Sequence, residues 1–204
     1  MQEIKSLLPQ LAEKIDSLYG LKQDSSIGKS VSAKFDILDD AINNLEPGKC
    51  YLIGGCASAY RTSKLSSIVC EMAVNKDLPV ILFTQSESAL EITTRLIGQA
   101  SGISTTKLRA GALEDNDWPL LVDALSQLND SHLFICDDNV NEVSLIRQIH
   151  SIQVWNKNLG LVVIDDFWLA TEFVLILKKI CLEFNIPIIL GWNCWGVRTD
   201  LLTD

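Results

Sequence analysis

The sequence predicts an α/β fold in which helices cover both faces of a mainly parallel sheet. Five short apolar runs have the length of buried strands, and amphipathic segments separate them. These runs are residues 50–54, 79–84, 132–137, 160–165 and 186–191. Apolar strands that alternate with amphipathic helices are typical of a parallel sheet buried between helical layers. A chain of 204 residues is long enough for one such domain, with little left over for a second.

The segments between the strands place their apolar side chains at helical spacing. The three clearest stripes are Leu65, Ile68, Val69, Met72 and Ala73; Trp118, Leu121, Leu125 and Leu128; and Phe173, Ile176, Leu177, Ile180 and Phe184. In open parallel sheets, ligands bind beyond the carboxyl ends of the strands. The residues that follow each strand are therefore the first candidates for a functional site.

The N-terminus is predicted to form a separate amphipathic helix. Five side chains share one helical face and are candidate docking residues: Leu8, Leu11, Ile15, Leu18 and Tyr19. A polar stretch follows, so residues 1–29 are assigned to a docking helix with its linker and residues 30–204 to the α/β domain. Because a lone helix of this length is marginal in water, its apolar face needs a partner surface. That surface belongs either to its own domain or to another subunit.

Composition narrows the classes of function. A net charge of −9 and a pI of about 4.7 disfavour a broad nucleic-acid surface, which needs clustered Lys and Arg. The six cysteines form no CxxC pair and have no Cys/His metal spacing, which favours a reducing, cytoplasmic compartment and no bound metal. Neither a signal peptide nor an apolar stretch of about 18 residues is visible, so no membrane association is expected.

A partial phosphate-loop pattern follows the first strand. In the pattern G-x-x-x-x-G-K-[ST], Gly55 and Thr62 match, whereas Tyr60 replaces the second glycine and Arg61 replaces the lysine. One Gly and one Thr at this spacing are weak evidence alone. Their position between a predicted buried strand and a predicted helix strengthens the assignment.

Several ordered blocks of sequence resemble the motor domain of DnaB-type replicative helicases, from about residue 5 to residue 198. They are residues 35–40 (FDILDD) with 45–48 (LEPG), 83–89 (FTQSESA) with 95–97 (RLI), 108–118 (LRAGALEDNDW), 135–138 (ICDD) with 146–147 (IR), and 163–165 (VID). The resemblance implies a RecA-like P-loop-NTPase-type fold. It also implies that the N-terminal helix, which ends in residues 15–19 (IDSLY), corresponds to a linker helix that packs on a neighbouring motor domain.

Against that family, the nucleotide-handling positions are altered. A phosphate cradle needs small residues, because its backbone N–H groups must close around phosphate oxygens, and Tyr60 adds a ring there. Arg61 keeps a charge, but its planar fork does not reach the point that an ammonium reaches. The acid that positions water falls on Ser86, a poor general base, although Glu87 is one residue away. The vestigial site is assigned to Gly55, Ser58, Tyr60, Arg61, Thr62, Ser86, Asp165 and Trp192.

Two of these positions keep residues that the resemblance implies. Asp165 stands where the magnesium-associated acid is expected, and Thr62 where the magnesium-binding hydroxyl is expected. Trp192 replaces a glutamine that would sense phosphate or DNA. The short segment after residue 165 carries no Lys or Arg, so a DNA-contacting loop is not expected there.

Three hypotheses follow for the function. The first is a non-hydrolysing, degenerate helicase-like protein without a cofactor, which binds a replicative helicase or related ring subunit or self-associates through its N-terminal helix. The second is a diverged ATPase that retains weak binding or slow hydrolysis of ATP with magnesium through Arg61, Thr62 and Asp165. The third, disfavoured by the acidic charge, is a single-stranded DNA binder that stacks bases on Trp192 and Trp195.

Overall fold

A computed structural model describes residues 1–19, 45–55, 58–138, 141–155, 159–166 and 171–193. Within these ranges the side chains of residues 18, 19, 55, 58, 59, 155, 171, 172 and 193 are not described. The predicted linker, the FDILDD block, Trp195 and most of the segment after Asp165 lie outside the described residues. No helix in the described part of the chain has the length and apolar character that crossing a bilayer requires.

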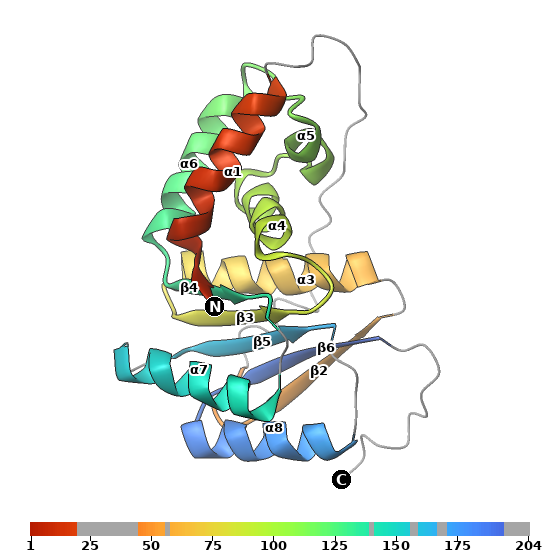
Figure 1. Cartoon of the computed structure of the whole chain (residues 1–204), viewed down its shortest axis with the longest axis vertical. Helices are drawn as coiled ribbons and strands as arrows, with labels where there is room; N and C mark the ends of the chain where they lie inside the picture. Colours follow the sequence, from red (N-terminus) through yellow and green to blue (C-terminus); the bar gives the residue numbers. More distant parts are fainter. Residues whose placement is uncertain (20–44, 56–57, 139–140, 156–158, 167–170, 194–204) are drawn as a thin grey trace.

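The sheet has six strands in the order β1-β4-β3-β5-β6-β2 (Figure 1). The five predicted strands are all present and all parallel: β2 (Cys50–Gly55), β3 (Val80–Thr84), β4 (Leu133–Cys136), β5 (Leu161–Asp165) and β6 (Ile188–Asn193). The sixth strand, β1 (Gln2–Glu3), pairs antiparallel with β4 and was not predicted. Two residues carry no periodicity, so only the tertiary structure reveals this edge pairing.

Helices cover both faces of the sheet, as the amphipathic segments predict (Figure 1). One side holds α3 (Ser58–Cys70) with its π-helical continuation η1 (Glu71–Asn75), α4 (Ala89–Ser101), α5 (Thr105–Ala110) and α6 (Asp117–Asp130); the other holds α7 (Glu142–Trp155) and α8 (Thr171–Phe184). Each of the five parallel strands contributes side chains to two separate cores, because successive side chains point to opposite faces of the sheet. In β5, for example, Val163 packs on the α3 side whereas Val162 and Ile164 pack on the α8 side.

The start of α4 is fixed beside the carboxyl end of β3. Ser88 and Glu91 form a capping box, in which each side chain accepts a hydrogen bond from the other residue's backbone N–H. The Asp137 carboxylate, which follows β4, accepts a further hydrogen bond from the Ala89 N–H at 2.9 Å. These contacts satisfy N–H groups that the first turn of a helix cannot pair internally.

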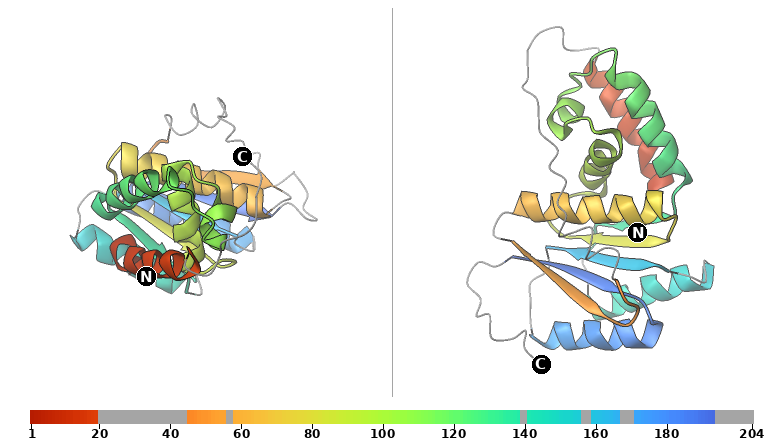
Figure 2. Two further views of the ribbon diagram at one scale, coloured as in Figure 1. Left: turned by 90° about the horizontal axis from the view of Figure 1, so that it is seen from above. Right: turned by 180° about the vertical axis from the view of Figure 1, so that it is seen from behind.

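The N-terminal helix α1 (Ile4–Tyr19) packs on its own domain. Its apolar face is 0–6% exposed and consists of Ile4, Leu7, Leu8, Leu11 and Ile15. This face contacts α4, α5 and α6, and Figure 2 shows α1 and α6 side by side in both views. The sequence left open whether α1 packs on its own domain or on another subunit. In the structure of the single chain, α1 packs on its own domain. Leu18 and Tyr19 belong to α1, but their side chains are not described.

Truncation of the α1 face should test this packing in the isolated chain. Leu11 is 2% exposed, so Leu11→Ala should leave a cavity and lower the free energy of unfolding by about 2–5 kcal/mol. Urea denaturation monitored by circular dichroism measures the change. Glu13→Ala, on the exposed face of the same helix, is the matched control and should change stability by less than about 0.5 kcal/mol. An unchanged midpoint for Leu11→Ala would mean that α1 does not pack on its own domain in solution.

Candidate functional site

The carboxyl ends of the central strands bring the candidate residues to one edge of the sheet. Gly55 at the end of β2 pairs in register with Asn193 of β6, and Thr84 at the end of β3 pairs with Asp165 of β5. Helix α3 begins shortly after β2, so its first turns lie over this edge. The predicted site residues of α3 and β5 therefore come together although about a hundred residues separate them in sequence.

The side chain of Arg61 fills the space between α3 and the carboxyl end of β5. Its side chain is buried, and the whole residue is only 1% exposed. Arg61 Nε donates a hydrogen bond to Asp165 Oδ1 at 3.0 Å, and Nη2 donates to Asp166 Oδ1 at 2.7 Å. Thr62 Oγ1 donates to the other carboxylate oxygen of Asp165 at 2.5 Å. The three residues that the sequence assigned to phosphate and magnesium are thus bonded to one another.

The close packing of this cluster depends on a glycine in β6. A Cβ atom at Gly191 would lie 2.6 Å from Leu65 Cδ1, 2.9 Å from Asp165 Oδ1 and 3.2 Å from Arg61 Cδ. Cβ contacts below 3.0 Å force neighbouring atoms to move. Glycine is therefore required at this position so that α3 can lie against β5 and β6 with the ion pair between them.

Asp165 and Asp166 occupy different environments. Burial raises the pKa of Asp165, and the hydrogen bonds from Thr62 and Arg61 act against that rise. Asp166 is partly exposed and has a backbone φ of 60°, in the left-handed region. A short polar side chain tolerates this conformation better than most others. The turn at Asp166 directs its carboxylate to the same guanidinium that Asp165 binds.

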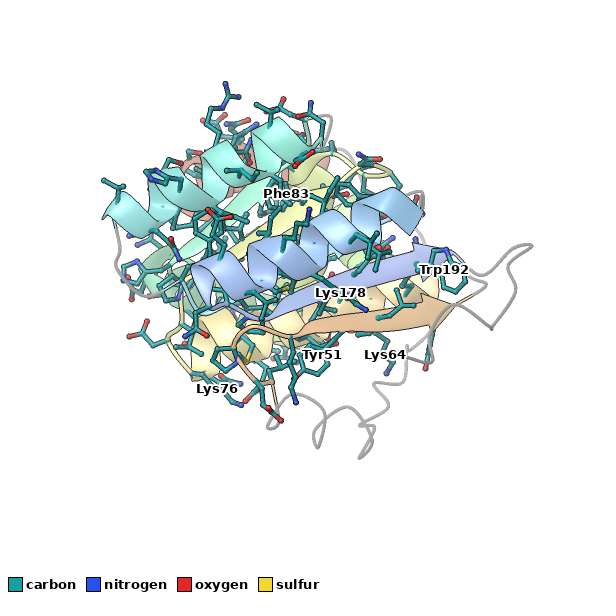
Figure 3. The ribbon with its side chains drawn as sticks, turned by 90° about the horizontal axis from the view of Figure 1, so that it is seen from below. Tyr51, Lys64, Lys76, Phe83, Lys178 and Trp192 are labelled. Carbon is teal, nitrogen blue, oxygen red and sulfur yellow. The ribbon has the colours of Figure 1, made fainter. Side chains whose placement is uncertain are left out.

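Two aromatic residues of the predicted site lie away from the ion pair. Tyr60 is 54% exposed, and the Lys64 ammonium stands 5.3 Å from the centre of its ring. Trp192 follows Gly191, which faces α3, so the alternation of a strand points Trp192 to the opposite face. Figure 3, viewed from the α8 side, shows its ring at the end of β6. Arg61, and not Tyr60 or Trp192, is thus the side chain that occupies the site.

The segment after β3 carries the residues predicted to replace the water-positioning acid. Ser86 is exposed. Glu87 is mostly buried and binds Arg95 of α4 through both carboxylate oxygens, at 2.6 Å to Nε and 2.5 Å to Nη2. A bidentate Arg–carboxylate pair is geometrically specific and strong. Glu87, the alternative to Ser86 as the water-positioning acid, is therefore already paired with Arg95 of the same chain.

Three contributors to the site were missed by sequence reasoning: Asp166, Arg95 and Gly191. Asp166 had a visible signal, since two consecutive carboxylates end a buried strand. Arg95 and Gly191 had none, because their roles depend on which elements pack together. Gly55 and Ser58 lie at the end of β2 and the start of α3 as expected, but the burial of Gly55 and the side chain of Ser58 are not described.

A double-mutant cycle should measure the buried pair. Arg61→Met should lower the free energy of unfolding by about 3–5 kcal/mol, because it leaves the Asp165 carboxylate buried without its cation. Combining it with Asp165→Asn should recover part of that loss, giving a coupling energy above about 1 kcal/mol by urea denaturation. Lys64→Met, on the same helix, is the control and should have a small effect. Strictly additive changes would contradict the pairing.

Comparisons with known proteins extend over most of the chain. The family model described as DnaB-like helicase C terminal domain matches residues 30–190. A "Probable replicative DNA helicase" of Guillardia theta is 26% identical over 202 residues, covering 91% of this chain and 33% of that protein. "Replicative DNA helicase DnaB" of Treponema pallidum is 27% identical over 199 residues, covering 91% of this chain and 45% of that protein. The chain therefore spans less than half the length of these two relatives.

Solved structures share the fold at low sequence identity. One, described as an "ATPase Domain", has a TM-score of 0.66 and 21% identity, and the match covers 100% of this chain and 76% of that one. Another, "The Structure Of A DnaB-Like Replicative Helicase And Its Interactions With Primase", has a TM-score of 0.65 and 16% identity, covering 89% and 56%. The predicted RecA-like architecture is confirmed, and the chain belongs to the family of DnaB-like helicase C-terminal domains.

Proposed function

We propose that this chain is a non-hydrolysing member of its family, which acts as a binding or regulatory subunit in DNA replication and needs neither ATP nor magnesium. The observation that carries the proposal is the cluster of Arg61, Thr62 and Asp165. Phosphoryl transfer needs a cation on the phosphates and a hydroxyl and an acid on the metal ion. Here the cation, the hydroxyl and the acid satisfy each other.

Nucleotide would have to disrupt this cluster before it could bind as in an active motor. Magnesium would compete with both Thr62 and Arg61 for the Asp165 carboxylate. Breaking a buried ion pair by removing one partner costs about 3–5 kcal/mol. Since 1.4 kcal/mol corresponds to a factor of ten, binding would weaken by about a hundredfold to a few thousandfold. The residues present thus fit poorly to a magnesium–nucleotide complex.

Hydrolysis has a second obstacle at the end of β3. A general base needs a carboxylate oxygen within hydrogen-bond reach of the attacking water. Both oxygens of Glu87 accept hydrogen bonds from Arg95, and Ser86 carries only a hydroxyl. The proposal therefore does not depend on the Arg61 cluster alone.

For the partner, we propose a subunit of a replicative helicase or related ring, or a second copy of this chain, joined through α1. The apolar face of α1 and the surface on α4, α5 and α6 are complementary within one chain. Such a pair of surfaces can also form between chains, because exchange of identical elements creates few new contacts. Residues 20–44 are numerous enough for α1 to reach a neighbour, since an extended chain spans up to about 3.5 Å per residue. We place this activity in the cytoplasm because the six cysteines form no CxxC pair and have no metal-ligand spacing, and we expect no direct DNA binding because the net charge is −9.

One observation favours a second candidate, a diverged ATPase with weak nucleotide binding. The Nη1 atom of Arg61 is buried and has no hydrogen-bond partner among the described residues. A buried N–H group without a partner costs free energy, and a phosphate oxygen would satisfy it. Arg61 could then hold phosphate through Nη1 while it still binds Asp165.

Calorimetry separates these two candidates. Titration of the full chain with ATP and Mg²⁺ should give no binding tighter than about 100 µM, or about −5.5 kcal/mol. An active member of the family, titrated under the same conditions, is the positive control. A dissociation constant below that value would favour the second candidate, and its loss in Thr62→Val would place the nucleotide at this site.

A pull-down experiment tests the proposed partner. The tagged full chain should retain the replicative helicase of its own organism at micromolar concentration, or form a defined oligomer by light scattering. The chain without residues 1–19 should lose either complex, because it lacks the docking helix. Glu13→Ala should leave binding unchanged. The absence of both complexes with the full chain, or equal binding by the shortened chain, would argue against docking through α1.

A further inference from the structure

Two cysteines meet at the edge of the sheet opposite the candidate site. Cys50 is the first residue of β2 and faces α8, where Cys181 lies in the second half of the helix. Both side chains belong to the apolar cluster between the sheet and α8, and each thiol influences the pKa of the other. Cys181 Sγ also lies 3.5 Å from the carbonyl oxygen of Lys49, the residue directly before Cys50. No disulfide joins them in the structure.

The environment makes Cys50 the more acidic thiol of the pair. The neighbouring Cys181 thiol lowers the pKa of Cys50, and the positive charge of Lys178 acts in the same direction, while burial opposes both. Lys178 lies one turn before Cys181 on α8. Cys50 is only partly buried, whereas Cys181 is buried. A partly accessible thiol that ionises readily is the nucleophile in thiol–disulfide exchange.

Another cysteine of the same fold shows the contrast. Cys70 of α3 donates a hydrogen bond to the Leu96 carbonyl oxygen, and burial together with the charge of Glu71 raises its pKa to about 12. Cys70 and Cys50 are both only partly buried, so the difference between their pKa values comes from their neighbours and not from exposure alone. Cys50 and Cys181 differ because each has a second sulfur as its neighbour.

We propose that Cys50 and Cys181 form a redox site, which a low-molecular-weight disulfide such as glutathione disulfide converts into an intramolecular disulfide between β2 and α8. The Cys50 thiolate attacks one sulfur of the small disulfide, so that a mixed disulfide forms and one small thiolate leaves. The Cys181 thiol then loses its proton to solvent, and its sulfur attacks Cys50 Sγ. The second small thiolate leaves, so one protein dithiol and one small disulfide become one protein disulfide and two small thiols.

The order of these steps follows from the charges. Cys181 has a raised pKa because of the neighbouring Cys50 thiol, because of its burial and because charge on Cys50 opposes its ionisation. Once Cys50 is part of a mixed disulfide it carries no charge, so this obstacle to the ionisation of Cys181 disappears. Cys50 thus attacks first and Cys181 resolves the intermediate.

The disulfide would attach the last strand of the described sheet to a helix. Among the described strands, β2 pairs only with β6, and it is the element that precedes α3 in the chain. A covalent link that closes a long loop stabilises the folded state chiefly by restricting the unfolded chain. Oxidation should therefore strengthen the attachment of β2.

Mass spectrometry on the full chain tests the proposal. The reduced protein is exposed to glutathione disulfide, quenched with N-ethylmaleimide and digested. Trypsin leaves Cys50 on one peptide with Cys56, and Cys181 on another with Cys194, so chymotryptic cleavage after Tyr51 and Phe184 is added. The expected product is a Cys50–Cys181 link. Cys50 should be modified about tenfold faster than Cys70, or more.

Two variants identify the order of attack. Cys181→Ser should stop at one glutathione on Cys50, whereas Cys50→Ser should leave Cys181 unmodified; Cys70→Ser is the control and should still form the link. The oxidised wild-type protein should melt roughly 5–10 °C higher than the reduced one, and dithiothreitol should reverse the shift. A link mapped to other cysteines, or Cys50 as slow as Cys70 in the wild-type protein, would overturn the proposal whatever the stability of the variants.

Discussion

The ion pair between Arg61 and Asp165 is the interaction on which the arrangement of the candidate site depends. It joins α3 to β5 across the carboxyl edge of the sheet, and Gly191 of β6 provides the space in which it fits. A buried ion pair is weak evidence for stability, because desolvation offsets most of the attraction between the charges. The ion pair instead constrains how α3 and β5 are placed relative to each other. Neither charge can leave the other without remaining unpaired in the interior, so the relative position of α3 and β5 is strongly constrained.

The same interaction is the basis of our proposal that this motor-type scaffold persists without motor chemistry. In a working site, the charges on the protein stay available and are compensated by nucleotide and metal ion. In this chain, Asp166 and Thr62 complete the compensation from within, and Arg95 does so for Glu87. This internal pairing supports the proposal of a binding subunit. The Nη1 atom of Arg61, which has no hydrogen-bond partner among the described residues, is the exception, and it is the feature that favours the second candidate.

The helix α1 and the edge strand β2 represent two different connections to the rest of the fold. α1 packs through an apolar face of five buried side chains, an interaction that is non-directional and available to an equivalent surface on another subunit. β2 is bound on one side by the directional hydrogen bonds of β6. The Cys50–Cys181 pair lies where β2 meets α8. The disulfide that we propose would therefore tie to α8 the strand that precedes the candidate site.

Sequence alone determined the fold class, because apolar periodicity reports burial directly: residues 50–54 and 160–165 had to be strands buried on both faces. It also identified Arg61, Thr62 and Asp165 as neighbours, through their resemblance to a known pattern of strand ends. Tertiary structure decided what those residues do together. Whether Arg61 points to solvent, to phosphate or to Asp165 depends on the space left by Gly191 and on the turn at Asp166. It likewise decided that Tyr60 lies at the surface and Trp192 on the opposite face. Such contacts join residues about a hundred positions apart, and local patterns carry no information about distances of that kind.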